Sequence, residues 1–516
     1  MIWGPSIFEF IRSHVPESGP GLSDECDTLP DEKPQYPASS MRWVPDMGWV
    51  PDIGPGEATD TVRQTVELLL DYAIQPTSAN KVAVYQHVLA APVVSIVDTV
   101  IEALLAREEA AHDQLAELAR SFVTEAADRD PVRFGIALMS SYRQPGHIEL
   151  IQTLGRHHVF TPVCTKVLAS SSNNPDEALW MLARNVTGRG RIHVIQRLAG
   201  TNNSALRRWL LGDAWRDGLS EADLVHDFYV QEELELTCAR VGGLRAALSD
   251  GDADLRLLND AGELIESLLD GGIDEYGEAC PALQAYLEGQ ARSAPTVKNL
   301  LRVDAVKRFL EKDVSDSGPR DEAGWTAESR HRLRTMCDRI LSRPESVDTV
   351  LAGLSSRDNH DFEWANEAAD ALGLDTWGIH WHRLQEQPTD SGRWHRLMAR
   401  ADERRIDQVM EFAHETLNLS RAPGEVSMGP GLPHTCVDAV LLYLRRFPGR
   451  GAWLVDASLK SPVVEIRKSA VVALRNWLAA GWPDGLVQSL ERAAGCEPDE
   501  NLRDLMQQVL RFHRSA

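Results

Sequence analysis

The sequence predicts an all-α fold: an α-solenoid of stacked helical repeats, preceded by an irregular, proline-rich N-terminal arm. Three observations lead to this prediction. Residues 146–155, GHIELIQTLG, return as GRIHVIQRLA at 190–199, so each position maps onto one 44 residues later. Apolar residues recur at helical spacing almost throughout the chain after Thr59. No alternating apolar stretch is joined to another by an Asn-Gly or Asp-Gly turn, as a β-hairpin would require.

Residues 1–58 are predicted to form the irregular arm. Its prolines prevent a helix of useful length from residue 14 onward; they are Pro16, Pro20, Pro30, Pro34, Pro37, Pro45, Pro51 and Pro55. The unit Trp-Val-Pro-Asp occurs at 43–46 and again at 49–52, and the glycine that follows each unit is typical of a turn. Two interpretations stay open. The tryptophans pin the arm to the helical body, which is favoured because large aromatic side chains usually become buried, or they form an exposed motif for a partner.

Residues 59–314 are predicted to form the first group of helical repeats. Between Asp98 and Val123 the apolar residues follow a helical stripe, and Asp98 is suited to cap its start. The stripe consists of Val100, Ile101, Leu104, Leu105, Leu115 and Leu118.

The 44-residue repeat extends beyond the ten quoted residues. Asp130-Pro131 and Asn174-Pro175 each place a capping residue before a proline at the first helical position, and two further helices follow in each unit. The apolar positions that correspond are Leu138 and Leu182, Ile148 and Ile192, Ile151 and Ile195, and Leu154 and Leu198. Periods of about 40–47 residues are typical of HEAT and armadillo arrays, whose units bury their apolar faces only by stacking.

Residues 434–516 are predicted to form C-terminal HEAT-like repeats, after a less regular helical region at 325–420. Ser461-Pro462 is expected to open a helix, and Gly481 with Pro483 to end it. The apolar stripe of this helix is Val463, Ile466, Ala470, Leu474 and Trp477. The connectors at 315–324 and 421–433 are rich in glycine and proline, so they are predicted to divide the array.

Composition limits the classes of partner. The net charge is −24, with 53 Lys and Arg against 77 Asp and Glu, so the surface repels phosphate backbones and anionic lipids. No run of eighteen apolar residues and no secretory leader is visible. The seven cysteines lack the spacing of a disulfide framework or a zinc ribbon. We therefore predict a cytoplasmic protein with free thiols, no nucleic-acid or membrane partner, and a protein partner that carries basic residues.

No catalytic residue, metal ligand or cofactor is assigned. Glu109 with His112 and Glu411 with His414 have the Glu-x-x-His spacing of carboxylate-bridged di-iron bundles. Among 16 histidines in an acidic chain, one or two such pairs are what chance delivers.

A group of tryptophans and histidines is the candidate partner-binding groove. Trp377, His380 and Trp381 stand three and four residues apart, which places them on one helix face. The full set is Trp364, Trp377, His380, Trp381, Trp394 and His395. Such a set lines the concave groove of a helical array, or it packs between successive helices, which is the slightly favoured interpretation.

Four segments carry a resemblance to a known family: RFGIALMSSY, TLGRHHVFT, GRGRIHVIQRLAG and QEELELTCARVGG. In them the chain resembles bacterial HEAT-repeat proteins of uncertain role, some of which are labelled limonene hydroxylase. The resemblance spans most of residues 40–516 and implies one alternative function, a monooxygenase with a non-haem metal site. It supplies no catalytic residue, and hydroxylation of an unactivated C–H bond needs activated oxygen. We therefore expect a non-enzymatic interaction protein, a scaffold, regulator or inhibitor.

Overall fold

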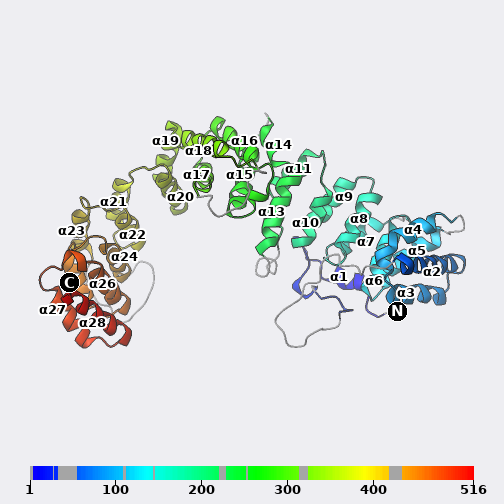
Figure 1. Ribbon diagram of the computed structural model, residues 1–516, viewed down its shortest axis with the longest axis horizontal. Helices are drawn as coiled ribbons and strands as arrows, with labels where there is room; N and C mark the ends of the chain where they lie inside the picture. Colours follow the sequence, from blue (N-terminus) through cyan, green and yellow to red (C-terminus); the bar gives the residue numbers. More distant parts are fainter. Residues whose placement is uncertain are drawn as a thin grey trace. The chain divides into compact units, whose positions relative to one another are not determined.

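The computed structural model describes residues 4–26, 28–32, 55–107, 112–142, 146–219, 228–250, 254–312, 324–417 and 433–515. Within these ranges the regular elements are helices and no strand occurs, which confirms the all-α prediction (Figure 1). The chain divides into two compact units, Met1–Thr349 and Val350–Ala516. The tandem Trp-Val-Pro-Asp units lie outside the described residues, and so do the two predicted connectors except for the last residue of each. The predicted domain boundaries therefore stay predictions.

Unit 1 is a succession of short helices. They are α1 Ile7–Ser13, α2 Pro55–Ile74, α3 Ser78–Ala90, α4 Val97–Leu105, α5 His112–Glu125, α6 Arg129–Met139, α7 His147–Leu154, α8 Thr161–Ser171, α9 Pro175–Ala183, α10 Gly188–Arg197, α11 Ser204–Leu211, α13 Phe228–Gly242, α14 Leu244–Ser249, α15 Leu255–Asp270, α16 Ala279–Arg292, α17 Val297–Glu311 and α18 Ala327–Leu341. Short 3-10 turns lie at Asp24–Cys26, Val93–Ile96 and Ile273–Glu275. Helix α19, Pro344–Leu354, crosses the boundary between the units.

Helices that are close in sequence pack together, which is the packing of an α-solenoid. Helix α6 packs on α8, α8 on α10, and α10 on α13, while α15 packs on α17 and α16 on α18. Each unit of such an array buries its apolar face against its neighbours. The prediction of an α-solenoid is therefore confirmed by the helix contacts.

The first part of the arm is docked on this array. Helix α1 packs on α5 and α7, and its Ile7 and Ile11 are fully buried. The Ser6 hydroxyl donates to the Thr124 carbonyl at 2.6 Å. Arg129 binds Asp31 at 3.0 Å, which fixes the chain beyond the 3-10 turn. The described part of the arm thus contains α1 and, from Pro55, the start of α2, where the sequence predicts only irregular structure.

The repeat appears as two matching triplets, α6–α7–α8 and α9–α10–α11. Leu154 and Leu198 are both buried, and so are the other matched leucines. The match is not complete, however. Ile192 is 3% exposed but Ile148 is 40% exposed. Helix α10 also begins at Gly188, whereas α7 begins only after Gly146, whose φ of 83° marks the left-handed region that favours glycine.

The predicted stripe from Asp98 to Val123 is divided between α4 and α5. Asp98 does not cap α4, because Ile96 holds the N-cap position and Asp98 lies in the first turn. There the carboxylate pairs with Lys166 of α8. An acidic side chain in the first turn still stabilises the helix through its dipole.

Unit 2 contains α20 Asn359–Ala371, α21 Trp377–Glu386, α22 Ser391–Ala399, α23 Ile406–Thr416, α24 Pro433–Leu444, α25 Ala452–Ser458, α26 Val464–Asn476, α27 Leu486–Cys496 and α28 Glu500–Ser515. Helices α22, α24, α26 and α28 pack in sequence, each on the next. Every residue of the predicted stripe from Val463 to Trp477 is buried, which confirms that part of the prediction. Arg467 binds the buried Glu497 at 2.6 Å and so ties α26 to the segment between α27 and α28.

Among the described residues, no single helix has both the length and the apolar composition needed to cross a bilayer. One bent pair, Ser78–Ala90 with Val93–Leu105, meets the same test by length and composition.

Candidate functional site

The predicted tryptophan–histidine set lies in unit 2 and is largely internal. Trp394 is fully buried, and Trp377 and His380 are 9% and 2% exposed. Trp364 and Trp381 are half-buried, and His395 is exposed. Half of the set is therefore sealed between helices, which is the packing interpretation. The groove interpretation stays a prediction for Trp364, Trp381 and His395.

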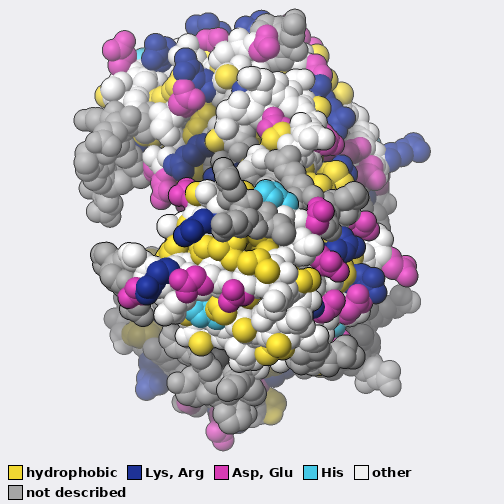
Figure 2. Space-filling model, turned by 90° about the vertical axis from the view of Figure 1, so that its right-hand side faces the viewer, with side chains coloured by type: hydrophobic (Ala, Val, Ile, Leu, Met, Phe, Trp, Pro, Cys, Tyr) yellow, Lys and Arg dark blue, Asp and Glu magenta, His cyan; other side chains and the backbone are white. Residues whose placement is uncertain are grey.

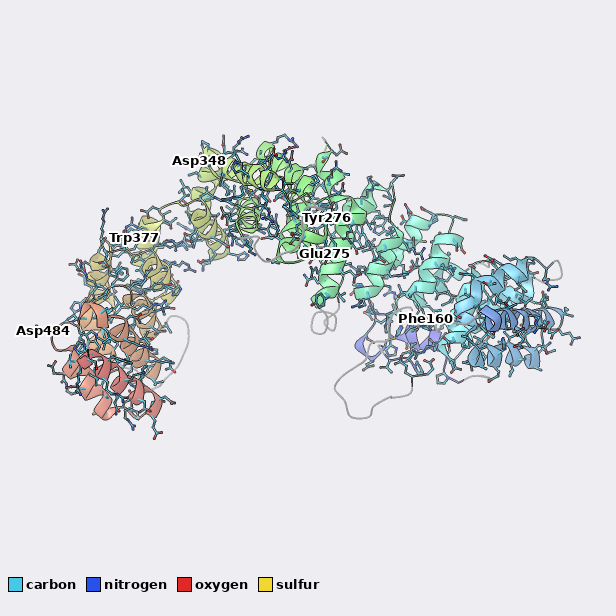
Figure 3. All side chains as sticks on the ribbon, in the orientation of Figure 1. Phe160, Glu275, Tyr276, Asp348, Trp377 and Asp484 are labelled. Atoms are coloured by element: carbon cyan, nitrogen blue, oxygen red, sulfur yellow. The ribbon has the colours of Figure 1, made fainter. Side chains whose placement is uncertain are left out.

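Three of the tryptophans form one aromatic stack between helices. Trp377 of α21, labelled in Figure 3, lies nearly parallel to Trp381 with ring centroids 6.2 Å apart. Phe412 of α23 contacts both Trp381, at 5.4 Å, and Trp394, at 5.7 Å. The Trp394 indole N–H donates to the Pro388 carbonyl at 2.8 Å, so its one polar atom is satisfied inside the core.

His380 is held as a neutral side chain in this core. Burial, together with Arg400, Arg396 and Arg383, lowers the pKa of His380 to about 4. Its Nε2 lies 2.8 Å from the Asn366 Oδ1, and Arg400 contacts the same oxygen at 3.0 Å. His380 therefore does not change charge near neutral pH.

The accessible members of the set point to different neighbours. His395 Nε2 lies 2.9 Å from the Tyr443 hydroxyl of α24, whereas Trp381 packs toward α23. Trp364 lies against His360 on its own helix, with ring centroids 3.9 Å apart. Trp381 and His395 thus contact different helices.

The two Glu-x-x-His pairs give no metal site in the described residues. Glu109 lies outside them, and His414 packs edge-on against Trp453 at 4.6 Å. Within the described ranges, no group of three or more His, Cys, Asp and Glu side chains is placed to hold a metal ion.

A stronger feature is the uneven distribution of charge in unit 1. From Asp217 to Gln290 the sequence contains 18 acidic residues and only three basic ones, Arg240, Arg245 and Arg256. The described part of this stretch contains α13, α14, α15 and most of α16. The net charge of the whole chain does not reveal this local excess of acidic residues. Counting charges in successive windows of the sequence does.

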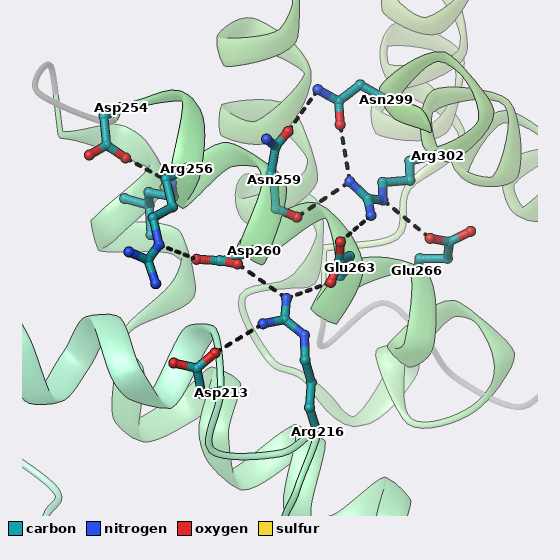
Figure 4. A network of polar contacts seen from close by, with 11 residues as sticks. Asp213, Arg216, Asp254, Arg256, Asn259, Asp260, Glu263, Glu266, Asn299 and Arg302 are labelled. Atoms are coloured by element: carbon teal, nitrogen blue, oxygen red, sulfur yellow. Dashed lines mark hydrogen bonds and ion pairs between the residues drawn. The ribbon is translucent and has the colours of Figure 1, made fainter. Parts of the chain in front are cut away.

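Arginines from outside the stretch neutralise one side of α15 (Figure 4). Arg302 of α17 binds Glu263 at 2.6 Å and Glu266 at 3.3 Å. Arg216, which follows α11, binds Asp260 at 3.2 Å and Glu263 at 2.5 Å. Burial opposes ionisation of Glu263, but the two arginines hold its pKa below the ordinary value. This network joins three neighbouring helical segments and so has a structural role.

The C-terminal end of α15, next to α13, carries a carboxylate that these arginines do not bind. We call Glu232 and Glu235 of α13 together with Asp270 of α15 the acidic seam. Within the described ranges, no lysine or arginine lies within ion-pair distance of these three carboxylates. Glu235 is only 3% exposed, and its Oε1 accepts from the Ser267 hydroxyl at 2.6 Å and from the Gln231 amide at 2.9 Å.

The surroundings of Glu235 oppose its ionisation. Burial raises the pKa of Glu235, and the charges of Glu232 and Asp270 raise it further. Asp270 is the last residue of α15, whose last turn contains no basic residue, so the negative end of the helix dipole adds to the carboxylates. Gly272 has φ 72°, and a Cβ there would lie 2.9 Å from Glu232 Cγ, so the turn permits the close approach of Glu232.

The basic residue of α13 is engaged elsewhere. Arg240 of α13 donates to the backbone carbonyl of Glu275 at 2.6 Å. Glu275 and Tyr276, labelled in Figure 3, lie five and six residues after Asp270, and Tyr276 is buried. By contrast, acidic and basic side chains are interspersed around a group of hydrophobic ones in the view from the side of α2–α5 (Figure 2).

The chain matches no protein-family model and no curated protein. Among solved structures it is similar to a "circular tandem repeat protein with novel repeat topology and enhanced subunit contact surfaces", at 13% identity over 90% of this chain and 97% of that one, with a TM-score of 0.15. The helical-repeat architecture rests on the helix contacts described above. Neither the HEAT family name nor the limonene hydroxylase label finds a counterpart among these matches, and no finding supports the monooxygenase alternative.

Proposed function

We propose that this protein is a non-enzymatic, helical-repeat interaction protein that binds a basic segment of a protein partner at the acidic seam of unit 1. The observation that carries the proposal is the pair of solvent-accessible carboxylates, Glu232 and Asp270, beside the buried Glu235, within a stretch of 18 acidic and three basic residues. Helical arrays commonly present extended surfaces of this kind to other polypeptides.

The chemistry of the acidic seam suits lysine and arginine side chains. Carboxylates accept charge-assisted hydrogen bonds from ammonium and guanidinium groups, and arginine binds them in a bidentate way. A basic partner would also relieve the repulsion among the three carboxylates. Complementary charge increases the association rate and makes binding depend on salt. The same potential repels phosphate groups, so nucleic acid is not the proposed partner.

Unit 2 contributes a second, smaller proposal. Trp364, Trp381 and His395 are the members of the predicted groove set that solvent reaches. Amphipathic aromatic side chains are typical of protein–protein contact surfaces. We therefore keep these three as partner-contacting candidates.

Fluorescence anisotropy with a labelled Lys/Arg-rich peptide tests the acidic seam directly. The triple variant Glu232→Gln, Glu235→Gln, Asp270→Asn removes three negative charges from it. The matched control, Glu102→Gln, Glu149→Gln, Glu177→Gln, removes three exposed charges from other helices of unit 1. Circular dichroism of both variants checks that the helices remain folded.

The proposal expects the wild-type protein and the control to bind the peptide with similar affinity. The acidic-seam variant is expected to bind at least about tenfold more weakly, which corresponds to about 1.4 kcal/mol. Added salt should weaken binding of the wild type more than that of the acidic-seam variant. Equal affinity of the two triple variants, or no binding by the wild type at low salt, contradicts the proposal.

A further inference from the structure

Helix α28, Glu500–Ser515, uses one face to pack on α26 and α27 in unit 2 (Figure 1). The buried residues of that face are Leu502, Met506, Val509 and Leu510. They recur at three- and four-residue spacing, so they form a stripe along the helix. The rest of the helix surface faces away from these neighbours.

A second stripe on α28 borders open space at the surface. Its residues are Asn501, Asp504, Leu505, Gln508, Arg511 and Phe512. Phe512 is 49% exposed, an unusual amount for a large aromatic side chain, and Leu505 is half-buried. At a rise of about 1.5 Å per residue, the stripe extends for about 16 Å along the helix. It therefore presents apolar side chains and both signs of charge on one narrow surface.

The order of these residues is self-complementary. Asp504 and Arg511 are two helical turns apart on one edge of the stripe, and Leu505 and Phe512 are two turns apart on the other edge. Gln508 lies midway. When two helices pack antiparallel about a two-fold axis, each edge faces the same edge of the second copy.

We propose that α28 is a self-association surface, on which two copies of this chain pack antiparallel about a two-fold axis near Gln508. Asp504 of each copy then faces Arg511 of the other, and Leu505 faces Phe512 of the other. A parallel arrangement would instead place the charged edge of one helix against the apolar edge of the other. The pattern of charge therefore selects the antiparallel dimer.

The charged residues are available for this contact. Asp504 and Arg511 are both exposed, and among the described residues the Arg511 guanidinium contacts only the Gln507 carbonyl of its own helix, at 3.4 Å. The other basic residues of α28 are engaged within the unit, since Arg503 donates to the Glu497 carbonyl and Arg514 binds Glu491. A stripe on a single helix buries less than the about 800 Å² per partner of a standard interface, so the dimer is expected to be weak.

Analytical ultracentrifugation of the full chain over a concentration series tests the proposal. The wild type is expected to show a reversible monomer–dimer equilibrium. In the variant Arg511→Asp, position 511 of each copy places a carboxylate opposite Asp504 of the other copy, so both ion pairs become repulsive. The variant is therefore expected to weaken dimerisation at least about tenfold. The double variant Asp504→Arg, Arg511→Asp exchanges the two charges and is expected to restore it.

Arg357→Asp, an exposed site before α20, is the matched control for the change in net charge, and it is expected to dimerise like the wild type. Thermal melting monitored by circular dichroism verifies that each variant is folded. A wild type that is monomeric at every concentration overturns the proposal. So does a dimer that is unaffected by Arg511→Asp, or one that the charge exchange does not restore. None of these outcomes depends on the peptide measurements for the acidic seam.

Discussion

The two isoleucines at the same position of the repeat are expected to differ in their contribution to stability. Ile148 of α7 and Ile192 of α10 are equivalent in sequence, but they are 40% and 3% exposed. Ile192→Ala removes a buried side chain and leaves a cavity, which costs about 2–5 kcal/mol. Ile148→Ala removes a side chain that solvent already reaches, and we expect it to cost about 1 kcal/mol or less. The gain in helix propensity from isoleucine to alanine is the same at both sites and cancels.

Urea unfolding followed by far-UV circular dichroism measures this difference. We expect the free energy of unfolding to fall by about 2 kcal/mol more in Ile192→Ala than in Ile148→Ala. The matched control is the pair Leu154→Ala and Leu198→Ala, because both leucines are buried and both variants should be similarly destabilised. Equal losses for the two isoleucine variants would refute the register in which α7 and α10 pack.

Three further predictions concern buried polar groups and thiols. Glu497→Gln removes one partner of the buried pair with Arg467 and should destabilise unit 2 by about 3–5 kcal/mol in the same denaturation assay. The control is Asp407→Asn, because Asp407 is exposed in its pair with Arg450, and this change should cost less than about 1 kcal/mol. Burial lowers the pKa of His157 to about 3, so the unfolded chain binds the extra proton. The contribution of neutral His157 to the free energy of unfolding is therefore fully present above about pH 6.5. As the pH drops toward 3, this contribution falls by up to about 1.4 kcal/mol per pH unit. Thermal melts at several pH values should show a smaller pH dependence for His157→Phe than for the wild type. Of the seven cysteines only Cys496 is exposed. A thiol reagent should therefore modify one cysteine rapidly in the folded protein and all seven in denaturant. Rapid modification of more than one cysteine in the folded protein would contradict the burial of the other six.

The histidine prediction depends on a tautomer that the fold imposes. The Val159 backbone N–H donates to His157 Nδ1 at 3.2 Å, which leaves the proton on Nε2, and Nε2 donates to the Cys26 carbonyl at 3.1 Å. The charged form would lose the first of these bonds. Cys26 and His157 are 131 residues apart in the sequence. The contact therefore becomes visible only in the tertiary structure, where the arm packs on the helices.

The acidic seam shows a similar limit. The sequence alone contains the excess of acidic residues between Asp217 and Gln290. It does not indicate which carboxylates are neutralised, because the arginines that bind α15, Arg216 and Arg302, lie on other segments of the array. Which carboxylates of α15 are neutralised therefore depends on how α15 packs between its neighbours.

The tryptophan–histidine set shows what helical spacing leaves undecided. Spacing places Trp377, His380 and Trp381 on one helix face, but spacing is the same for a face that lines a groove and for one that packs inside. Burial separates the alternatives: His380 is sealed with Asn366, while Trp381 remains partly accessible. Periodicity specifies which residues share a face, and only the neighbouring helices decide what that face meets.

By itself, the sequence determined the all-helical fold, the stacked repeats and the stripe from Val463 to Trp477 that closes the core around α26. These features follow from local periodicity, capping residues and the inability of one repeat to bury its own apolar face. The tertiary structure alone decided that Ile148 is exposed while Ile192 is buried, that arginines neutralise one side of α15, and that one stripe of α28 is left open. Each of these depends on contacts between segments distant in the chain, which local sequence patterns do not encode.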